Sequence, residues 1–177
     1  MRSMIDYCRE EQRPFSQLPF HDVDSLVLSQ LAYLNWEGRV PKLGEKRPPV
    51  FLWETVKGPH IEQMYEGLWT PQKNRQLLQY VTENPRFRNL RLKEYVNHID
   101  EQQEKQFSAL VFLMEDDTAY VAFRGTDATF IGWKEDLNMA FLSPIPSQEE
   151  SVTYLNTVGK SCLLYTSIAI SEVEGPQ

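Results

Sequence analysis

The chain has 177 residues, of which 41% are hydrophobic and 24% are charged, a composition typical of one globular domain with a sizeable core. Its formal net charge of -7 and its pI of about 5.0 argue against a nucleic-acid-binding protein, because phosphate binding requires clustered lysine and arginine side chains.

Residues 1–15 contain no apolar segment of signal-peptide length. No window of the sequence approaches the roughly 18 apolar residues of a membrane-spanning helix. The two cysteines, Cys8 and Cys162, have neither metal-binding nor redox spacing. We therefore expect a reduced, cytoplasmic protein with no nucleic-acid partner and no transmembrane segment.

Apolar residues recur at helical spacing through residues 24–35, which predicts an amphipathic helix with Asp22 or Asp24 as its N-cap. Gly38 is expected to stop this helix. Several prolines and glycines within residues 40–59 favour an irregular connection.

A second helix is predicted to start at Thr70-Pro71, where a hydroxyl cap precedes a proline in the first turn, and to end at Asn84-Pro85. Residues 90–105 fit either a helix or a strand. Both assignments stay open at this point.

Residues 107–114 are continuously apolar apart from one serine, and their length suits a buried strand. The acidic residues 115–117 read as a tight turn, and Ala119–Phe123 as a returning strand rich in β-formers. The sequence thus predicts a β-hairpin within a larger sheet.

The strand Ala119–Phe123 runs into Arg124, Gly125 and Thr126 without a polar spacer. Gly125 has no Cβ, so a substrate or another chain can approach closely there. Thr126 offers a backbone N–H and a hydroxyl from one position, and fixed donors of this kind stabilise an oxyanion. The alternative is a strand followed by a turn, with Arg124 in a structural ion pair.

The sequence YVAFRGT, followed by GWKEDL, resembles the oxyanion strand of the class 3 lipases, which are α/β-hydrolases. The wider resemblance covers about residues 4–155 and points to an uncharacterised bacterial branch of these lipase-like hydrolases. It implies an α/β fold of the α/β-hydrolase type and serine esterase activity on small-molecule or lipid esters. It implies neither a cofactor nor a metal.

The resemblance also implies roles for individual residues. Thr126 would be the oxyanion residue, giving its backbone N–H and its hydroxyl, and Asp136 would accept from that hydroxyl and orient it. Trp133 would lie in the lid region. Gly125 would allow close approach, and Arg124 would be a scaffold residue.

The catalytic triad of such an enzyme is missing from the sequence. The fold requires a Gly-x-Ser-x-Gly segment, then an acid and a histidine, in that order. The nearest segment, GKSCL at residues 159–163, has one glycine of two. His21, His60 and His98 all precede the predicted oxyanion strand and are expected to be structural groups, so we expect this chain to be inactive alone.

Residues 1–159 are therefore interpreted as the N-terminal part of a single α/β-hydrolase domain with an incomplete sheet. Within residues 160–177, SCLLYTS resembles translated adapter sequence, which indicates a truncated or chimeric reading frame; a genuine divergent strand over residues 162–170 is the alternative. The leading hypothesis is the N-terminal portion of a lipase- or esterase-like serine hydrolase. The rival hypotheses are a non-catalytic hydrolase-like domain for binding or scaffolding, and a small α/β binding module unrelated to lipases.

Overall fold

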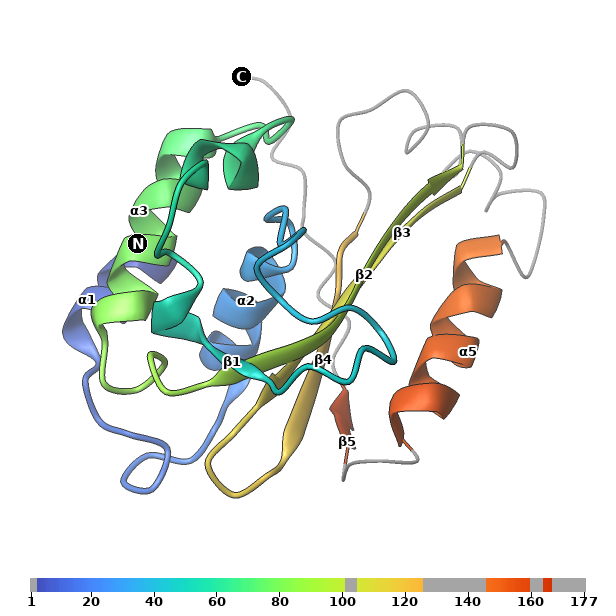
Figure 1. Ribbon diagram of the computed structural model, residues 1–177. Coiled ribbons are helices and arrows are strands. Elements are labelled where there is room, and N and C mark those ends of the chain that lie inside the picture. Colours follow the sequence, from blue (N-terminus) through green and yellow to red (C-terminus); the bar gives the residue numbers. More distant parts are fainter. Residues whose placement is uncertain (1–2, 101–104, 126–145, 160–163, 167–177) are drawn as a thin grey trace.

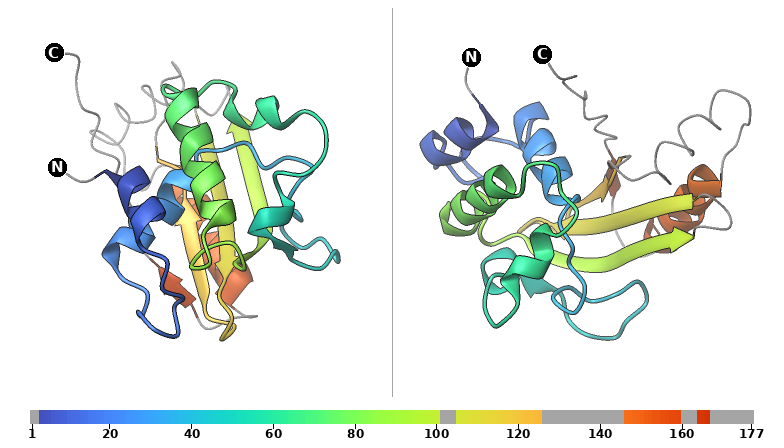
Figure 2. Two further views of the ribbon diagram at one scale, coloured as in Figure 1. Left: turned by 90° about the vertical axis from the view of Figure 1, so that its left-hand side faces the viewer. Right: turned by 90° about the horizontal axis from the view of Figure 1, so that it is seen from above.

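The computed structural model describes residues 3–100, 105–125, 146–159 and 164–166, which form one sheet with helices on both faces (Figures 1 and 2). The strands lie in the order β1-β2-β3-β4-β5. Helices α1, α2 and α3 cover one face, and α5 covers the other. The helices are α1 (Met4–Glu10), α2 (Asp22–Leu31), α3 (Pro71–Glu83) and α5 (Pro146–Gly159), with 3-10 turns η1 (Leu52–Glu54) and η2 (Ile61–Tyr65). The strands are β1 (Val50–Phe51), β2 (Arg91–Asp100), β3 (Lys105–Leu113), β4 (Ala119–Phe123) and β5 (Leu164–Thr166).

The two central strands, β3 and β4, bury side chains on both faces of the sheet. Alternate residues belong to two separate apolar clusters, because successive side chains of a strand point to opposite faces. The cluster beneath α1, α2 and α3 includes Leu110, Phe112, Tyr120 and Ala122. The cluster beneath α5 includes Ala109, Val111, Ala119, Val121, Tyr154 and Val158.

The expected α/β-hydrolase fold is wrong, because that fold is built on a parallel sheet whereas β1, β2, β3 and β4 pair antiparallel throughout. The physical reason lies in the connections. The Met114 N–H donates to the Thr118 carbonyl at 2.9 Å and closes a tight turn between β3 and β4. A tight turn can join only antiparallel neighbours, since parallel strands need a crossover of about a dozen residues or more. Among the described strands, β5 alone is parallel to its neighbour β4, and the chain reaches it through α5.

The predicted hairpin and the second predicted helix are confirmed, and the open assignment of residues 90–105 is decided. The predicted hairpin consists of β3 and β4, and Ala119–Phe123 is the strand β4. The helix predicted between Thr70 and Asn84 is α3, with Pro71 in its first turn, although the Thr70 hydroxyl makes no capping bond. The ambiguous residues 90–105 contain the strand β2.

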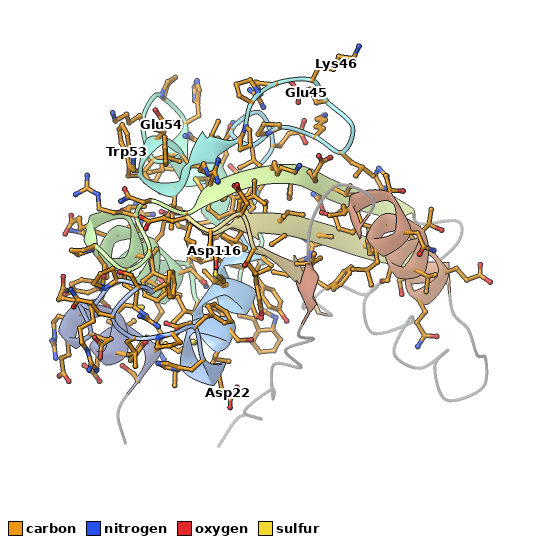
Figure 3. All side chains as sticks on the ribbon, turned by 90° about the horizontal axis from the view of Figure 1, so that it is seen from below. Asp22, Glu45, Lys46, Trp53, Glu54 and Asp116 are labelled. Carbon is orange, nitrogen blue, oxygen red and sulfur yellow. The ribbon has the colours of Figure 1, made fainter. Side chains whose placement is uncertain are left out.

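Helix α2 starts earlier than predicted and has a different cap. His21 is the N-cap: its Nδ1 accepts from the Val23 N–H at 3.3 Å, and its own N–H donates to the Asp24 carboxylate at 3.0 Å. Asp22, one of the two expected caps, is an exposed first-turn residue whose side chain points away from the fold (Figure 3). The helix ends at Leu31, well before Gly38.

Strand β2 contains a β-bulge that sets which face its side chains reach. The pairing with β3 shifts between Lys93 and Val96, and Glu94 has a left-handed φ of 57°. The Glu94 carboxylate accepts from the Gly44 N–H at 2.7 Å, and its carbonyl accepts from the Tyr154 hydroxyl at 2.7 Å. The extra residue places Tyr95 in the cluster beneath α2 and Val96 in the cluster beneath α5.

A fully buried ion pair joins α2 to the turn that follows α3. The Arg86 Nη2 and the Asp24 Oδ2 lie 2.5 Å apart, and neither side chain is exposed to solvent. Arg86 also donates to the carbonyls of Arg13, Leu18 and Pro19, and the Tyr7 hydroxyl donates to Asp24 at 2.8 Å. These contacts hold the irregular segment between α1 and α2 against the rest of the domain.

We predict that Asp24→Asn lowers the free energy of unfolding by about 3–5 kcal/mol, because it leaves the Arg86 charge buried without its counter-ion. Urea unfolding followed by circular dichroism measures the change. Glu62→Gln, which removes an exposed partner of Arg75, is the matched control and should leave the midpoint almost unchanged. Equal changes in the free energy of unfolding would show that breaking the buried pair costs no more than breaking the exposed one.

Candidate functional site

The candidate site lies where β4 ends. The Arg124 N–H donates to the Ser108 carbonyl at 2.9 Å, which extends the pairing with β3 by one residue beyond Phe123. Gly125 is the last described residue before residue 146. The strand therefore ends at the position that the sequence predicts, and it delivers Arg124 and Gly125 to the edge of the core.

The residues with the most specific predicted chemistry lie outside the described part of the chain. Thr126, the predicted oxyanion donor, Asp136, its predicted partner, and Trp133 of the predicted lid region are all in this group, as is Ser161. Their roles stay predictions. Gly125 is the predicted site residue whose surroundings the structure gives.

A tyrosine hydroxyl fills the space beside Gly125. A Cβ on Gly125 would lie 2.8 Å from the Tyr33 Oη, which is too close for an unshifted side chain. Tyr33 follows the C-terminus of α2 and is half-buried. The group next to Gly125 in the described structure is thus the Tyr33 hydroxyl, and close approach of a substrate at Gly125 stays a prediction.

Tyr95 and Ser108 lie beside Arg124 on the same face of the sheet. Burial raises the pKa of Tyr95, while the Trp36 backbone N–H, the charge of Arg124 and the Ser108 side chain act in the opposite direction. These groups therefore surround the Tyr95 hydroxyl. Sequence reasoning did not identify Tyr33 or Tyr95, because both come from segments distant in the chain and neither belongs to a motif.

The three histidines take part in local structure rather than in the site at the end of β4. His21 caps α2 and lies 3.2 Å from the Tyr7 hydroxyl. His98 pairs through Nδ1 with Glu150 of α5 at 2.6 Å. His60 precedes η2 in a left-handed conformation, with φ of 62°.

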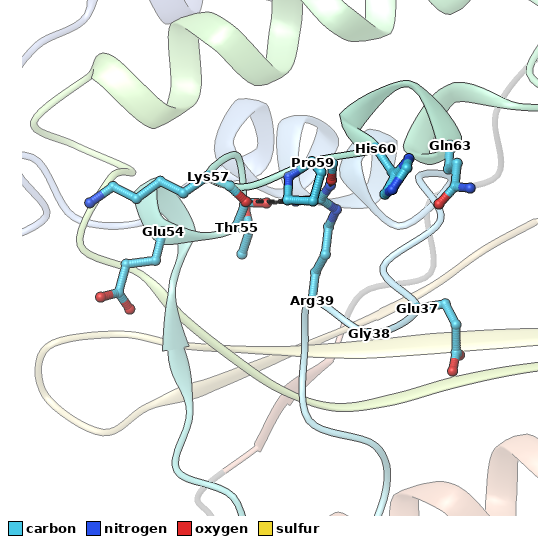
Figure 4. A pocket seen from close by; sticks show the side chains of 9 residues that line it. All are labelled: Glu37, Gly38, Arg39, Glu54, Thr55, Lys57, Pro59, His60 and Gln63. Carbon is cyan, nitrogen blue, oxygen red and sulfur yellow. Dashed lines mark hydrogen bonds between the residues drawn. The ribbon is translucent and has the colours of Figure 1, made fainter.

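A hollow of about 400 Å³ lies away from the end of β4, between the segment after α2 and the segment around η1 (Figure 4). Its central cation, Arg39, donates to the carbonyls of Thr55, Lys57 and Pro59 at 2.7 to 3.0 Å. The Glu54 side chain points away from Arg39 (Figure 4). Arg39 therefore ties two loops together, and its hydrogen bonds are directed to backbone rather than to a free space. The lining residues are Glu37, Gly38, Arg39, Glu54, Thr55, Lys57, Pro59, His60 and Gln63.

The described residues contain no group of three or more histidine, cysteine, aspartate or glutamate side chains that could hold a metal ion. Among the helices in the described ranges, none has the length and apolar character needed to cross a membrane.

Residues 81–168 match the Mbeg1-like family, a family of unknown function. The match runs from the end of α3 to β5 and includes Tyr95, Arg124 and Gly125. No curated protein and no solved structure matches the chain. The resemblance to the class 3 lipases therefore stays an expectation from the sequence.

We predict that Gly125→Ala destabilises the protein by about 1–3 kcal/mol, because the new methyl group must displace the Tyr33 side chain. In a double-mutant cycle, Tyr33→Phe should remove much of this cost by removing the hydroxyl that the methyl group meets. Urea unfolding of the two single variants and the double variant measures the coupling. Purely additive effects would mean that Tyr33 and Gly125 do not constrain each other.

Proposed function

We propose that this chain carries the oxyanion-stabilising part of a carboxylic ester hydrolase that acts on acyl esters of small molecules or lipids. One observation carries the proposal: β4 ends in the core at Phe123 and leads directly into Arg124 and the closely packed Gly125. Thr126 is the next residue in the sequence. A donor at this position would be attached to a strand with neighbours on both sides, and such fixed donors stabilise a developing oxyanion most effectively.

In the proposed reaction a serine attacks the ester carbonyl, and the negative charge that develops on the carbonyl oxygen is stabilised at Thr126. The Thr126 N–H and hydroxyl both donate to that oxygen, and Asp136 orients the hydroxyl. The sequence contains no Gly-x-Ser-x-Gly segment. We therefore propose that the nucleophile and its acid and base come from sequence outside these 177 residues. The reaction needs no cofactor.

The contacts of two histidines support the proposal that the catalytic base comes from outside these 177 residues. The proposed base must reach the serine that attacks the ester. His21 and His98 instead contact Tyr7 and Glu150, on opposite faces of the sheet. Neither belongs to the end of β4.

The rival proposal is a non-catalytic domain that uses the same strand end for binding. It is favoured by the side chains of Arg124 and Tyr95, because the buried Nη2 of the arginine and the buried hydroxyl of the tyrosine have no hydrogen-bond partner in the described part of the chain. Both the 177-residue chain and any longer gene product would then bind the ligand without hydrolysing it.

The cytoplasmic location also belongs to this proposal. It is supported by Cys8, a buried and unpaired cysteine, since free thiols persist in reducing compartments.

The 177-residue chain is expected neither to cleave p-nitrophenyl esters above background nor to react with a fluorophosphonate probe. The reason is that it contains no serine in a complete nucleophile segment. Mass spectrometry after probe treatment checks this. Stoichiometric labelling at Ser161 would contradict the expectation and would make residues 159–163 the nucleophile segment.

In a longer gene product that hydrolyses esters, Thr126→Val should lower kcat by up to roughly 10²–10³, because one oxyanion donor is lost while the backbone N–H remains. Asp136→Asn should act in the same direction by releasing the hydroxyl. Thr153→Val, on the exposed side of α5, is the matched control and should leave kcat unchanged. Full activity of both test variants in folded protein would sink the oxyanion assignment, and absence of hydrolysis in any gene product would favour the binding domain.

A further inference from the structure

Two buried polar atoms without hydrogen-bond partners lie on one face of the sheet near the end of β4. The Arg124 Nη2 and the Tyr95 Oη are both inaccessible to solvent, and neither has a partner within the described residues. Tyr95 is 2% exposed. Buried polar groups are nearly always hydrogen-bonded in folded proteins, so two such atoms in one place require an explanation.

The strand geometry explains why the two side chains lie on the same face of the sheet. Phe123 packs with the cluster beneath α5, so the following residue, Arg124, points to the opposite face. The bulge in β2 places Tyr95 on that same face. Ser108 lies on the strand between them, where its carbonyl accepts from the Arg124 N–H.

Three groups near the Tyr95 hydroxyl partly offset the effect of burial on it. Burial raises the pKa of Tyr95, while the backbone N–H of Trp36, the guanidinium of Arg124 and the Ser108 side chain act in the opposite direction. None of the three makes a hydrogen bond to the Tyr95 Oη, which has no partner in the described structure. A positive charge therefore lies near a hydroxyl group that can still donate.

Arg86 and Arg39 show how buried or partly buried guanidinium groups are satisfied elsewhere in the described structure. Arg86 donates to a carboxylate and to three backbone carbonyls, and Arg39 donates to three carbonyls. The Nη2 of Arg124 has no such acceptor among the described residues.

We propose that Arg124 and Tyr95 form a binding site for an oxyanion, a carboxylate or phosphate group carried by a small molecule or a lipid. The guanidinium supplies a charge-assisted hydrogen bond through Nη2, and the Tyr95 hydroxyl supplies a second donor to the same group. Binding at this site does not require the proposed ester hydrolysis. It can be measured on a chain that shows no turnover.

The test is a titration of the purified chain with sodium phosphate and, separately, sodium acetate, each against sodium chloride at the same ionic strength. Amide NMR spectra should show saturable shifts at Ser108, Arg124 and Gly125 for at least one of the two anions. The anion that binds more tightly identifies the class of ligand. If neither phosphate nor acetate shifts these amide signals more than sodium chloride does, the proposal is overturned. That result would indicate that the two donors are satisfied by water.

Variants separate this site from adventitious anion binding. Arg124→Gln and Tyr95→Phe should each weaken binding, by about tenfold for the arginine, since hydrogen bonds to charged groups are the stronger ones. Arg75→Gln removes a surface charge on α3 and is the matched control. Unchanged affinity in Tyr95→Phe and Arg124→Gln would place the anion elsewhere. If Arg124→Gln does not fold, the near-isosteric Tyr95→Phe and the location of the wild-type shifts still decide the question.

Discussion

The buried ion pair between Asp24 and Arg86 is the interaction on which the layer of helices α1, α2 and α3 depends. Neither charge reaches water, so α2 and the turn after α3 must stay in contact for either charge to be tolerated. Burial would lower the pKa of Arg86, but the hydrogen bonds and charge of Asp24 raise it. The arginine therefore stays charged, and its remaining N–H groups donate to backbone carbonyls of the segment between α1 and α2.

The position of α2 connects this ion pair to the end of β4. The Oγ atoms of Ser25 and Ser29 in α2 lie 2.9 and 2.8 Å from the hydroxyl of Tyr120, the second residue of β4. These contacts fix the helix along the strand, and Tyr33, just beyond the helix, then lies against Gly125. The candidate site is thus bordered by a residue whose position is set by packing across the whole layer.

The sequence predicts the parts of this fold that depend on local pattern. Continuous apolar runs on either side of an acidic turn predict the β3–β4 hairpin, because a strand buried on both faces needs no alternation. Residues 90–105 are ambiguous for a physical reason. The bulge at Glu94 shifts the alternation of side chains between the two faces by one residue, so Leu92 and Val96 lie on opposite faces although they are four residues apart. The apolar residues therefore do not follow the regular period of two that marks a strand. The fold class failed because a motif at the end of one strand describes local geometry, whereas strand direction depends on the connections. The sequence predicts where β4 ends, at Phe123, whereas the position of Tyr33 beside Gly125 depends on tertiary contacts that no local pattern encodes.

The β2 bulge also has a consequence for how sequences related to this one should be compared. One residue of backbone length between Lys93 and Val96 decides which side of the sheet each later β2 side chain occupies. A relative of equal length whose β2 is regular would direct the equivalent of Tyr95 toward α5 and the equivalent of Val96 toward α2. A relative that lacks the extra residue would instead keep both side chains on their present faces, without a bulge. Aligning such a relative with no gap at this point would therefore pair residues from opposite faces of the sheet.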